Sequence, residues 1–193
     1  MSLVLCSGGI DSATILWVLA PAGSLAMSVD YGQRAAEAER RAASLLASRT
    51  KMEHLHLAVP RIGAQLQSAL TGDGRVQVPR ETVVPGRNAL LISIAVGVAA
   101  SRGLKRVLIG CNATDASVYP DCRREFVSHL DATYRKAYGV AVQAPLLDLT
   151  KSEVVRMARQ AGLPIEETTS CYLGHACGSC HACVVRREAM EVA

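Results

Sequence analysis

A glycine-rich turn near the start of the chain restricts the folds open to it. Residues 6–13 read CSGGIDSA and lie between the short apolar run 3–5 and the apolar segment 13–19. The run is typical of a buried strand and the segment has the length of a buried helix, so the turn joins a strand to a helix. Glycines leave room for an anion beside the unpaired backbone N–H groups at a helix start. The turn is therefore suited to bind a phosphate.

Apolar segments and helix-length segments alternate along the rest of the chain. Strands are predicted at 3–6, 25–29, 54–58, 107–110 and 140–145, and helices at 12–19, 35–48, 88–101, 123–138 and 152–161. This alternation predicts an α/β fold with a doubly wound parallel sheet. Because only 4% of the residues are aromatic, we expect a core of Ala, Val, Leu and Ile. Thr150 and Glu153 have the spacing of a capping box, which places a helix start just after Thr150.

Two regions interrupt the alternation. Residues 71–85 contain two glycines and two prolines and are predicted to form a loop near the ligand-binding edge of the sheet. Residues 168–183 carry four cysteines and are predicted to form a separately organised knuckle. We therefore divide the chain into an α/β domain, residues 1–165, and a C-terminal cysteine knuckle with a terminal helix, residues 166–193.

Charge and hydropathy favour a cytoplasmic protein. The net charge of +4 is spread over the helical segments, which fits small anionic substrates at least as well as nucleic acid. The longest apolar stretch, 89–100, is shorter than the roughly 20 residues that span a bilayer. No basic region precedes the first apolar run, so a secretory signal is not expected. We expect no membrane segment and no stable nucleic-acid partner, and the seven cysteines should be reduced or metal-bound.

The C-terminal cysteine cluster predicts a metal site. Its members are Cys171, Cys177, Cys180 and Cys183. Four thiolates can converge on one zinc ion at about 2.3 Å, and four protein ligands leave no open position, so the zinc would be structural. An iron–sulfur cluster and disulfides are alternatives, and either His175 or His181 could replace a cysteine.

Two polar segments are candidates for substrate binding. Arg87 and Asn88 lead into the apolar helix, where Asn88 could simply be the N-cap. Residues 110–123 follow a predicted strand and are polar enough to recognise the edge of a base. Cys111 and Cys122 in this segment are expected to be small buried residues, because no activating neighbour is evident.

Together these motifs resemble the 7-cyano-7-deazaguanine synthase (QueC) family of the ATP pyrophosphatase superfamily. The matching segments cover most of the chain, in the order SGGIDSA, VDYGQR, VPGRN, NATDASVYPDCR, PLLDLTKSEV and the cysteine cluster. The first segment lacks the lysine of a GxxxxGK[ST] loop and is similar to the SGGxDS loop of enzymes that cleave ATP between its α and β phosphates. The resemblance implies an adenine nucleotide alpha hydrolase-like fold and a homodimer.

The family implies a zinc-containing ligase that uses ATP with Mg²⁺. It converts 7-carboxy-7-deazaguanine and ammonia into 7-cyano-7-deazaguanine (preQ0) for queuosine biosynthesis, through an adenylated carboxylate and an adenylated amide. By this resemblance ATP is bound by Ser7, Gly8, Gly9, Asp11, Ser12 and Lys151, and Asp11 could help to hold magnesium. Candidates for binding or activating the deazapurine are Tyr31, Gln33, Arg34, Arg87, Asn88, Asn112, Asp115, Tyr119 and Asp121. Arg87 is expected to bind an anionic group, and Asp115 or Asp121 the ring donors.

Departures from the family pattern leave room for other products. The stretch between His56 and Val84 is abbreviated, the first cysteine gap is short, and Ala35 and Gly86 replace the common histidine and alanine. One alternative is a divergent ligase that stops at the amide or joins the carboxylate to another amine for DNA or protein modification. A tRNA-thiolating enzyme would need a nucleophilic cysteine and a larger basic surface. An alternative of another class is a zinc protein that binds nucleotide or RNA without turnover, although Tyr172 is the only aromatic residue in the knuckle.

Overall fold

Five parallel strands form one sheet at the centre of the structure. This computed structural model describes the backbone of residues 1–193 and every side chain except that of Pro60. The strand order is β3-β2-β1-β4-β5. The strands are β1 (Leu3–Leu5), β2 (Leu25–Asp30), β3 (Glu53–Ala58), β4 (Arg106–Leu108) and β5 (Ala141–Gln143). Because β2 and β4 lie on either side of β1, the order reverses there, and parallel sheets bind ligands at the carboxyl ends beside such a reversal.

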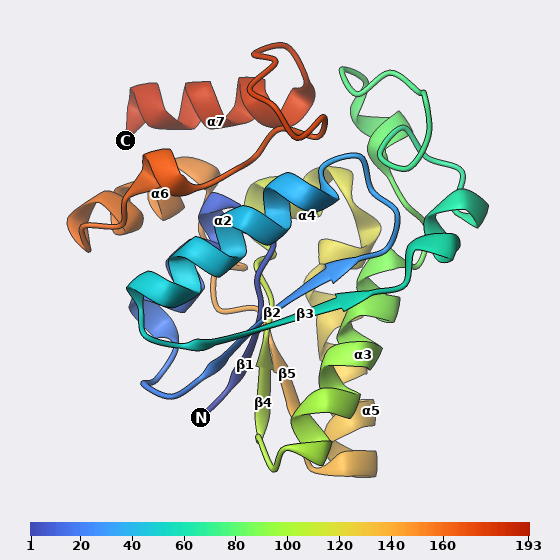
Figure 1. Cartoon of the computed structure of the whole chain (residues 1–193), viewed down its shortest axis with the longest axis vertical. Helices are drawn as coiled ribbons and strands as arrows, with labels where there is room; N and C mark the ends of the chain where they lie inside the picture. Colours follow the sequence, from blue (N-terminus) through green and yellow to red (C-terminus); the bar gives the residue numbers. More distant parts are fainter.

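Helices cover both faces of the sheet. The α-helices are α1 (Ile10–Thr14), α2 (Ala36–Arg49), α3 (Arg87–Ser101), α4 (Ala113–Val118), α5 (Arg124–Tyr138), α6 (Lys151–Gln160) and α7 (His181–Val192). Residues from α1, α2, α6 and α7 share one core with the sheet, and residues from α3 and α5 share the other (Figure 1). The doubly wound parallel fold predicted from the sequence is therefore confirmed.

Strand β1 shows how the sequence builds the two cores. Leu3 and Val4 are both fully buried, and successive strand residues point to opposite faces. Leu3 therefore joins the core under α3 and α5, whereas Val4 joins the core under α1 and α2. Ala26, paired with Val4, and Ala43 on α2 are small, so the helix packs close to the sheet. The large fully buried side chains are Leu, Ile and Val, with Met27 as the one exception, and none is aromatic, as the low aromatic content predicts.

The first helix changes its pitch after five residues. It continues as a π-helical turn, η1 (Ile15–Leu19). Trp17 on this turn packs against the α1/α2 core, and its Nε1 donates to the Ala161 carbonyl, at the end of α6, at 3.1 Å. This hydrogen bond joins the segment that follows the glycine turn to a helix from the far end of the chain.

Helix α3 is long and strongly apolar. With the 3₁₀ turn η3 (Pro79–Thr82) it belongs to the stretch Pro79–Ser101, which is long and apolar enough to cross a membrane by length and composition alone. In the structure, Ile92, Val96 and Ala99 are buried in the core shared with β1 and β4. Their burial is what a core helix of an α/β fold requires.

The C-terminal segment lies over the carboxyl ends of the strands (Figure 1). It enters through η5 (Ile165–Glu167), and the Thr169 amide donates to the Gly8 carbonyl at 2.8 Å. Arg186 on α7 donates to Thr168 Oγ1 at 2.7 Å and to the Ile165 carbonyl at 2.7 Å. The cysteine-bearing segment is thus bonded to the glycine turn where it begins, and helix α7 at its end is bonded back to residues 165–168.

The predicted loop 71–85 packs against the cysteine segment. It follows η2 (Pro60–Gln65) and includes η3, while η4 (Pro120–Cys122) lies further along the chain. Leu70, Val76 and Val84 form a small third core with Cys171 and Cys180. The short stretch between β3 and α3 therefore rests on the cysteine knuckle.

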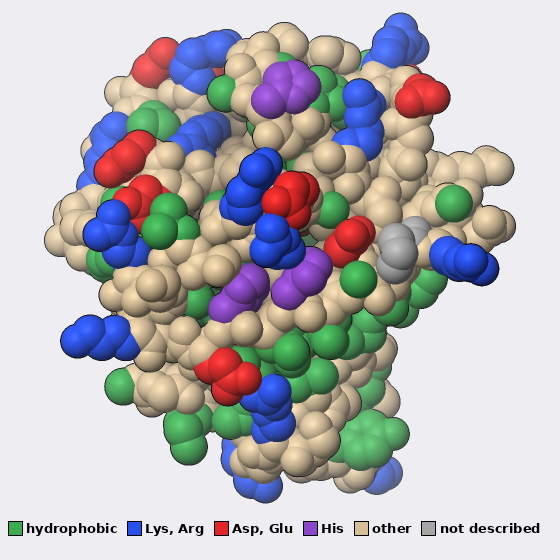
Figure 2. Space-filling view, in the orientation of Figure 1, with side chains coloured by type: hydrophobic (Ala, Val, Ile, Leu, Met, Phe, Trp, Pro, Cys, Tyr) green, Lys and Arg blue, Asp and Glu red, His purple; other side chains and the backbone are tan. Residues whose placement is uncertain are grey.

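Surface charge follows the expectation drawn from the sequence. The face seen in Figure 2 mixes Lys and Arg with Asp and Glu side chains, and on the described residues of this face they form no continuous basic stripe. Several of the basic side chains are paired locally, for example Arg40 with Glu37 at 2.8 Å on α2.

Candidate functional site

The glycine turn between β1 and α1 has the geometry of a phosphate loop. Gly9 is the N-cap of α1 and no side chain caps this helix, so its first backbone N–H groups remain open. The Ser7 and Ser12 hydroxyl oxygens lie 3.5 Å apart. Gly8 has a φ of +74°, and a Cβ there would lie 2.5 Å from the Ala42 Cβ, so α2 packs directly on the loop. Open amides and converging hydroxyls are what a bound pyrophosphate needs.

Charged side chains meet at the edge of this loop. Lys151 Nζ donates to Asp11 Oδ2, and Asn112 Nδ2 donates to Asp11 Oδ1 at 3.1 Å. Asn112 Nδ2 also donates to Asp115 Oδ2 at 2.8 Å, so one amide joins two carboxylates. Burial, followed by the charge of Asp11, raises the pKa of Asp115 to about 6. Paired carboxylate oxygens beside a phosphate loop are suitable ligands for Mg²⁺.

Helix caps hold these side chains in place. Thr150 caps α6 through the predicted capping box, which the structure confirms, and Lys151 is the first residue of that helix. Asn112 caps the short helix α4, where its Oδ1 accepts a hydrogen bond from the Asp115 amide at 2.9 Å. Gly110 precedes this cap, and a Cβ there would lie 3.2 Å from the Asp11 Cβ. The end of β4 can therefore lie directly against the start of α1.

Arg87 forms another wall of the site. Gly86, with a φ of +74°, is the N-cap of α3, so Asn88 is not the cap that the sequence allowed. Arg87 Nε donates to Asn88 Oδ1 at 3.1 Å, and the Asn88 backbone N–H donates to Asp121 Oδ2 at 3.2 Å. Burial opposes the charged form, but Tyr31 and Asp121 hold the pKa of Arg87 above its ordinary value. A fixed positive charge is thus available for an anionic group.

A carboxylate that the sequence did not single out faces the same cavity. Glu39 Oε2 accepts a hydrogen bond from Gln33 Nε2 at 2.8 Å, and burial raises the pKa of Glu39. The remaining Gln33 groups are also used: Nε2 donates to the Val29 carbonyl at 3.1 Å and Oε1 accepts from the Tyr31 amide at 2.8 Å. The helical period carried a signal for Glu39, because it shares a face with the buried residues Ala42, Ala43 and Leu46.

Three hydroxyl groups connect separate segments beside the site. Tyr119 Oη lies 2.9 Å from Thr82 Oγ1 and 2.9 Å from Tyr172 Oη. Burial, and then Tyr119, raises the pKa of Tyr172 above its ordinary value. The chain of hydroxyls joins the η3 turn, the segment after α4 and the cysteine knuckle, and Tyr172 was not predicted as a site residue.

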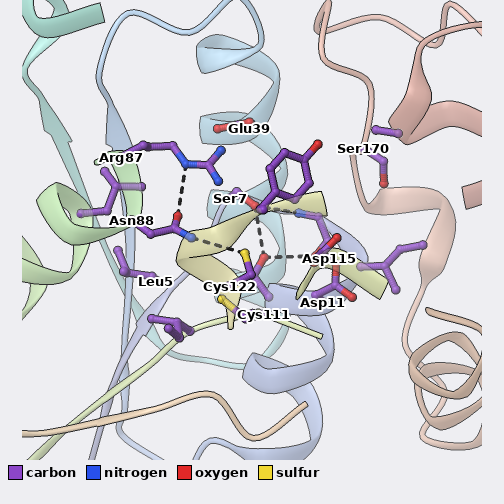
Figure 3. A pocket seen from close by; sticks show the side chains of 18 of the residues that line it. Leu5, Ser7, Asp11, Glu39, Arg87, Asn88, Cys111, Asp115, Cys122 and Ser170 are labelled. Atoms are coloured by element: carbon purple, nitrogen blue, oxygen red, sulfur yellow. Dashed lines mark hydrogen bonds between the residues drawn. The ribbon is translucent and has the colours of Figure 1, made fainter. Parts of the chain in front are cut away.

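The phosphate loop, Arg87 and Glu39 line one common cavity of about 300 Å³ (Figure 3). Every residue predicted for ATP except Gly8 lines it, namely Ser7, Gly9, Asp11, Ser12 and Lys151. The predicted substrate residues in its wall are Tyr31, Arg87, Asn88, Asp115 and Tyr119. The other four lie behind the wall, namely Gln33, Arg34, Asn112 and Asp121.

The four residues behind the wall hold other parts of the structure. Arg34 Nη1 donates to the carbonyls of Gly72 and Gly74, both at 3.3 Å, and so fixes the loop before α3. Asn112, Gln33 and Asp121 make the hydrogen bonds to cavity residues described above. These contacts orient the wall, and direct contact with substrate by the four residues remains a prediction.

Cys111 and Cys122 lie at the floor of the cavity and are both buried. A hydrogen bond with Cys122, together with burial, raises the pKa of the Cys111 thiol. A raised pKa suppresses the nucleophilic thiolate, which agrees with the prediction of small buried residues.

The four predicted metal ligands converge. The Sγ atoms of Cys171, Cys177, Cys180 and Cys183 all lie within 4.8 Å of one another. Tetrahedral zinc with Zn–S bonds of about 2.3 Å separates its sulfurs by about 3.8 Å, and Cys177 Sγ and Cys183 Sγ are 4.0 Å apart. Burial opposes ionisation of Cys177, but the Cys180 and Ser179 amides lower its pKa to about 6. The thiol set fits a metal ion such as zinc, and the cluster includes neither His175 nor His181.

The fold and the phosphate loop define an ATP pyrophosphatase-type, or PP-loop, nucleotide-binding protein. Its fold is similar to the solved structure of NMN synthetase from Francisella tularensis. The TM-score is 0.53 at 18% sequence identity, covering 86% of this chain and 63% of that chain.

The family described as Queuosine biosynthesis protein QueC matches residues 1–193. The chain belongs to this QueC family. It is 39% identical over 202 residues to the 7-cyano-7-deazaguanine synthase of Porphyromonas gingivalis W83, covering 98% of this chain and 92% of that protein. It is 39% identical over 203 residues to the synthase of Archaeoglobus fulgidus, covering 97% of this chain and 84% of that protein. For the synthase of Cupriavidus necator the identity is 38% over 216 residues, covering 100% and 93%.

The predicted family is therefore confirmed, and with it the assignment to a synthase family. The comparisons favour neither the divergent ligase nor the non-catalytic zinc protein. The alignment with the Cupriavidus protein spans 216 positions against the 193 residues of this chain, so that relative carries insertions. The expected abbreviation between His56 and Val84 stays a prediction.

Proposed function

We propose that this protein converts 7-carboxy-7-deazaguanine and ammonia into 7-cyano-7-deazaguanine at the expense of ATP. The observation that carries the proposal is one cavity that contains both the phosphate loop and the cationic wall at Arg87. The QueC family match and the printed names of the relatives support the choice of product.

In this proposal the phosphate loop holds the pyrophosphate of ATP. The backbone amides at the start of α1 and the Ser7 and Ser12 hydroxyls would bind its oxygens. Lys151 would neutralise negative charge as the bond between the α and β phosphates breaks, while Asn112 holds the two neighbouring carboxylates. Asp11 would help to hold Mg²⁺, which neutralises phosphate charge, and the four cysteines would hold a structural zinc.

The deazapurine would lie between the loop and the opposite wall. Arg87 would bind its carboxylate and bring it to the α-phosphate, because a carboxylate needs a leaving group before ammonia can displace an oxygen. Asp115 and Tyr119 would accept or donate hydrogen bonds at the ring edge, with Tyr119 fixed by its hydroxyl neighbours. The same loop can serve twice, first for the carboxylate and then for the amide, whose adenylation and loss of AMP give the nitrile.

A product assay tests the proposal. The purified protein is incubated with 7-carboxy-7-deazaguanine, ATP, Mg²⁺ and ammonium, and the products are followed by mass spectrometry. We expect the nitrile, with AMP and pyrophosphate formed in a ratio of about two per nitrile. Ser12→Ala should abolish pyrophosphate release, whereas Ser128→Ala on the exposed face of α5 should not. An amide that accumulates without nitrile would refute the proposal in favour of the divergent ligase.

We also propose that residues 166–193 form a zinc-stabilised cap on a catalytic domain of residues 1–165. The protein would act as a homodimer in the cytoplasm. A shallow surface groove between α3 and α5, which includes Gly97 and the 62% exposed Tyr138, supports a dimer contact there. Light scattering on the purified chain, with Tyr138→Glu as the variant expected to give monomers, tests this assembly.

A further inference from the structure

Glu39 is an acidic group in the cavity wall to which no role has been given. The cavity has three acidic side chains among its lining residues, Asp11, Asp115 and Glu39. The first two share the Asn112 amide, and Asp11 is paired with Lys151. The carboxylate of Glu39 takes part in none of the ion pairs found among the described side chains. A partly exposed, unpaired carboxylate in a cavity for anionic substrates needs a physical explanation.

Gln33 fixes the orientation of this carboxylate. Both hydrogen-bonding ends of its side chain are engaged, with Val29 and Tyr31 on the strand side and Glu39 on the helix side. Gln33 is buried, so it cannot turn toward solvent or substrate without losing these bonds. The Oε2 atom of Glu39 is therefore held in place by Gln33, and this hydrogen bond also fixes the position of Oε1.

Glu39 lies between the two parts of the site that the proposed reaction uses, the phosphate loop and Arg87. Ala42, one turn further along α2, is the residue against which Gly8 of the phosphate loop packs. Figure 3 shows Glu39 above Arg87 and Ser7 in the same cavity. The carboxylate thus lies near the phosphate loop, where the leaving phosphate would be, and near Arg87, where the substrate carboxylate would be.

Four ionisable groups face Glu39 from the elements around it. Arg87 on α3 lowers its pKa and Asp30 at the end of β2 raises it, while burial has the largest effect and raises it. The charge of Glu39 in turn acts on Cys6 at the end of β1 and on Tyr31 after β2. A carboxylate whose pKa is raised is a stronger base than an exposed one and accepts a proton more readily.

We propose that Glu39 binds the incoming ammonium ion and removes its proton, so that ammonia can attack the adenylated carboxylate. This inference rests on the proposed function. Ammonia is largely protonated at neutral pH and has no free electron pair in that form. Glu39 would take one proton from NH₄⁺, the nitrogen would form a bond to the carbonyl carbon, and the carbon–oxygen bond to AMP would break. AMP leaves with the bonding electrons, and the second nitrogen proton passes to its phosphate or to water.

The inference is tested by separating the two chemical steps. Glu39→Gln keeps the size of the side chain and removes its basicity. We expect pyrophosphate release without ammonium to stay near the wild-type rate, while amide formation with ammonium falls by about 100-fold or more. Glu37→Gln is the matched control on the same helix, because Glu37 is exposed and paired with Arg40. It should change neither step.

A comparison of hydroxylamine with ammonium separates proton removal from a purely structural role, because a structural defect would lower the rate with both amines. It is largely unprotonated at neutral pH, so Glu39→Gln should form the hydroxamate at a rate within several-fold of the wild type. With ammonium, the deficit of the variant should shrink as the pH is raised and free ammonia becomes abundant.

Two results would overturn the role of Glu39 while leaving the proposed function intact. One is an equal loss with ammonium and hydroxylamine at every pH. The other is a raised KM for ATP with unchanged turnover, which would show that Glu39 binds the ribose of ATP. A wild-type protein that releases no pyrophosphate with the carboxylate would instead refute the proposed function, and the inference with it. Thermal unfolding of both variants shows whether each is folded.

Discussion

Replacing Asp115 by asparagine should stabilise the protein at neutral pH while damaging the site. The pKa of this carboxyl rises from an ordinary value of 3.8 to about 6 on folding, first because of burial and then because of Asp11. Each pKa unit corresponds to about 1.4 kcal/mol, so ionised Asp115 destabilises the fold by up to about 3 kcal/mol. The side chain is partly open to the cavity, and solvent reduces this figure. We expect Asp115→Asn to gain about 1–2 kcal/mol at pH 7.

The pH dependence gives the prediction its sign. Because the folded pKa is the higher one, the folded state keeps its proton where the unfolded chain has lost it. The stability from this group is therefore fully present below about pH 4 and is lost as the pH rises to about 6. Asparagine has no such loss, so the advantage of the variant should be greatest near pH 7 and should narrow toward pH 4.

Urea unfolding of both proteins at several pH values measures the difference in unfolding free energy between Asp115→Asn and the wild type. The comparison is made between variant and wild type at the same pH, because protonation of the cysteines affects both alike. Asp148→Asn is the control, since Asp148 is 81% exposed and should give a small difference that changes little with pH. A variant that is less stable than the wild type at pH 7, or a gap that is constant with pH, would refute the reasoning. We also expect Asp115→Asn to abolish turnover, because a site that keeps unfavourable charges for its function gains stability and loses activity when one of them is removed.

The other predictions concern the loop, the knuckle and a helix start. Gly8→Ala should lose about 2–5 kcal/mol of unfolding free energy, because it combines a positive φ with a Cβ position 2.5 Å from Ala42. Gly86→Ala, which has the same φ but open space around it, should lose only about 1–2 kcal/mol in the same urea experiment. Cys177→Ser should bind much less zinc than the wild type and unfold at a lower temperature, and a variant that binds as much zinc as the wild type would contradict the proposed ligand set. Thr150→Ala should lower stability by about 1 kcal/mol through loss of the capping box, and an unchanged urea midpoint would show that the cap contributes nothing.

Much of the fold was predictable because its signals are local. The run at β1, the glycine turn and the capping box at Thr150 each depend on neighbours within four residues, and the structure shows all three. Helix α4 was not predicted, since it has only six residues and no buried side chain to produce a helical period. Its start could have been found from Asn112 and Asp115, which have the spacing of a cap and its third helical residue.

The site was less predictable because its residues depend on packing between distant segments. Gln33 was predicted as a candidate for binding or activating substrate, and this role stays a prediction. In the structure its side chain lies behind the cavity wall and is bonded to Val29, Tyr31 and Glu39, which no local pattern indicated. Glu39 and Tyr172 face the cavity only because α2 packs on the phosphate loop and the knuckle lies over the strand ends. The helical period of α2 indicates which face is buried, but it does not show that this face meets the phosphate loop. The cysteine spacing, by contrast, predicted the four-cysteine cluster almost directly.

Trp17 gives the protein an optical label of its own. It is the single tryptophan of the chain, and its indole N–H is bonded to the end of α6. The two helices that meet there begin at the phosphate loop and at Lys151, so movement of either helix on nucleotide binding would alter the surroundings of the indole. Excitation of this one side chain therefore makes the unlabelled protein suitable for stopped-flow fluorescence measurements of ATP binding.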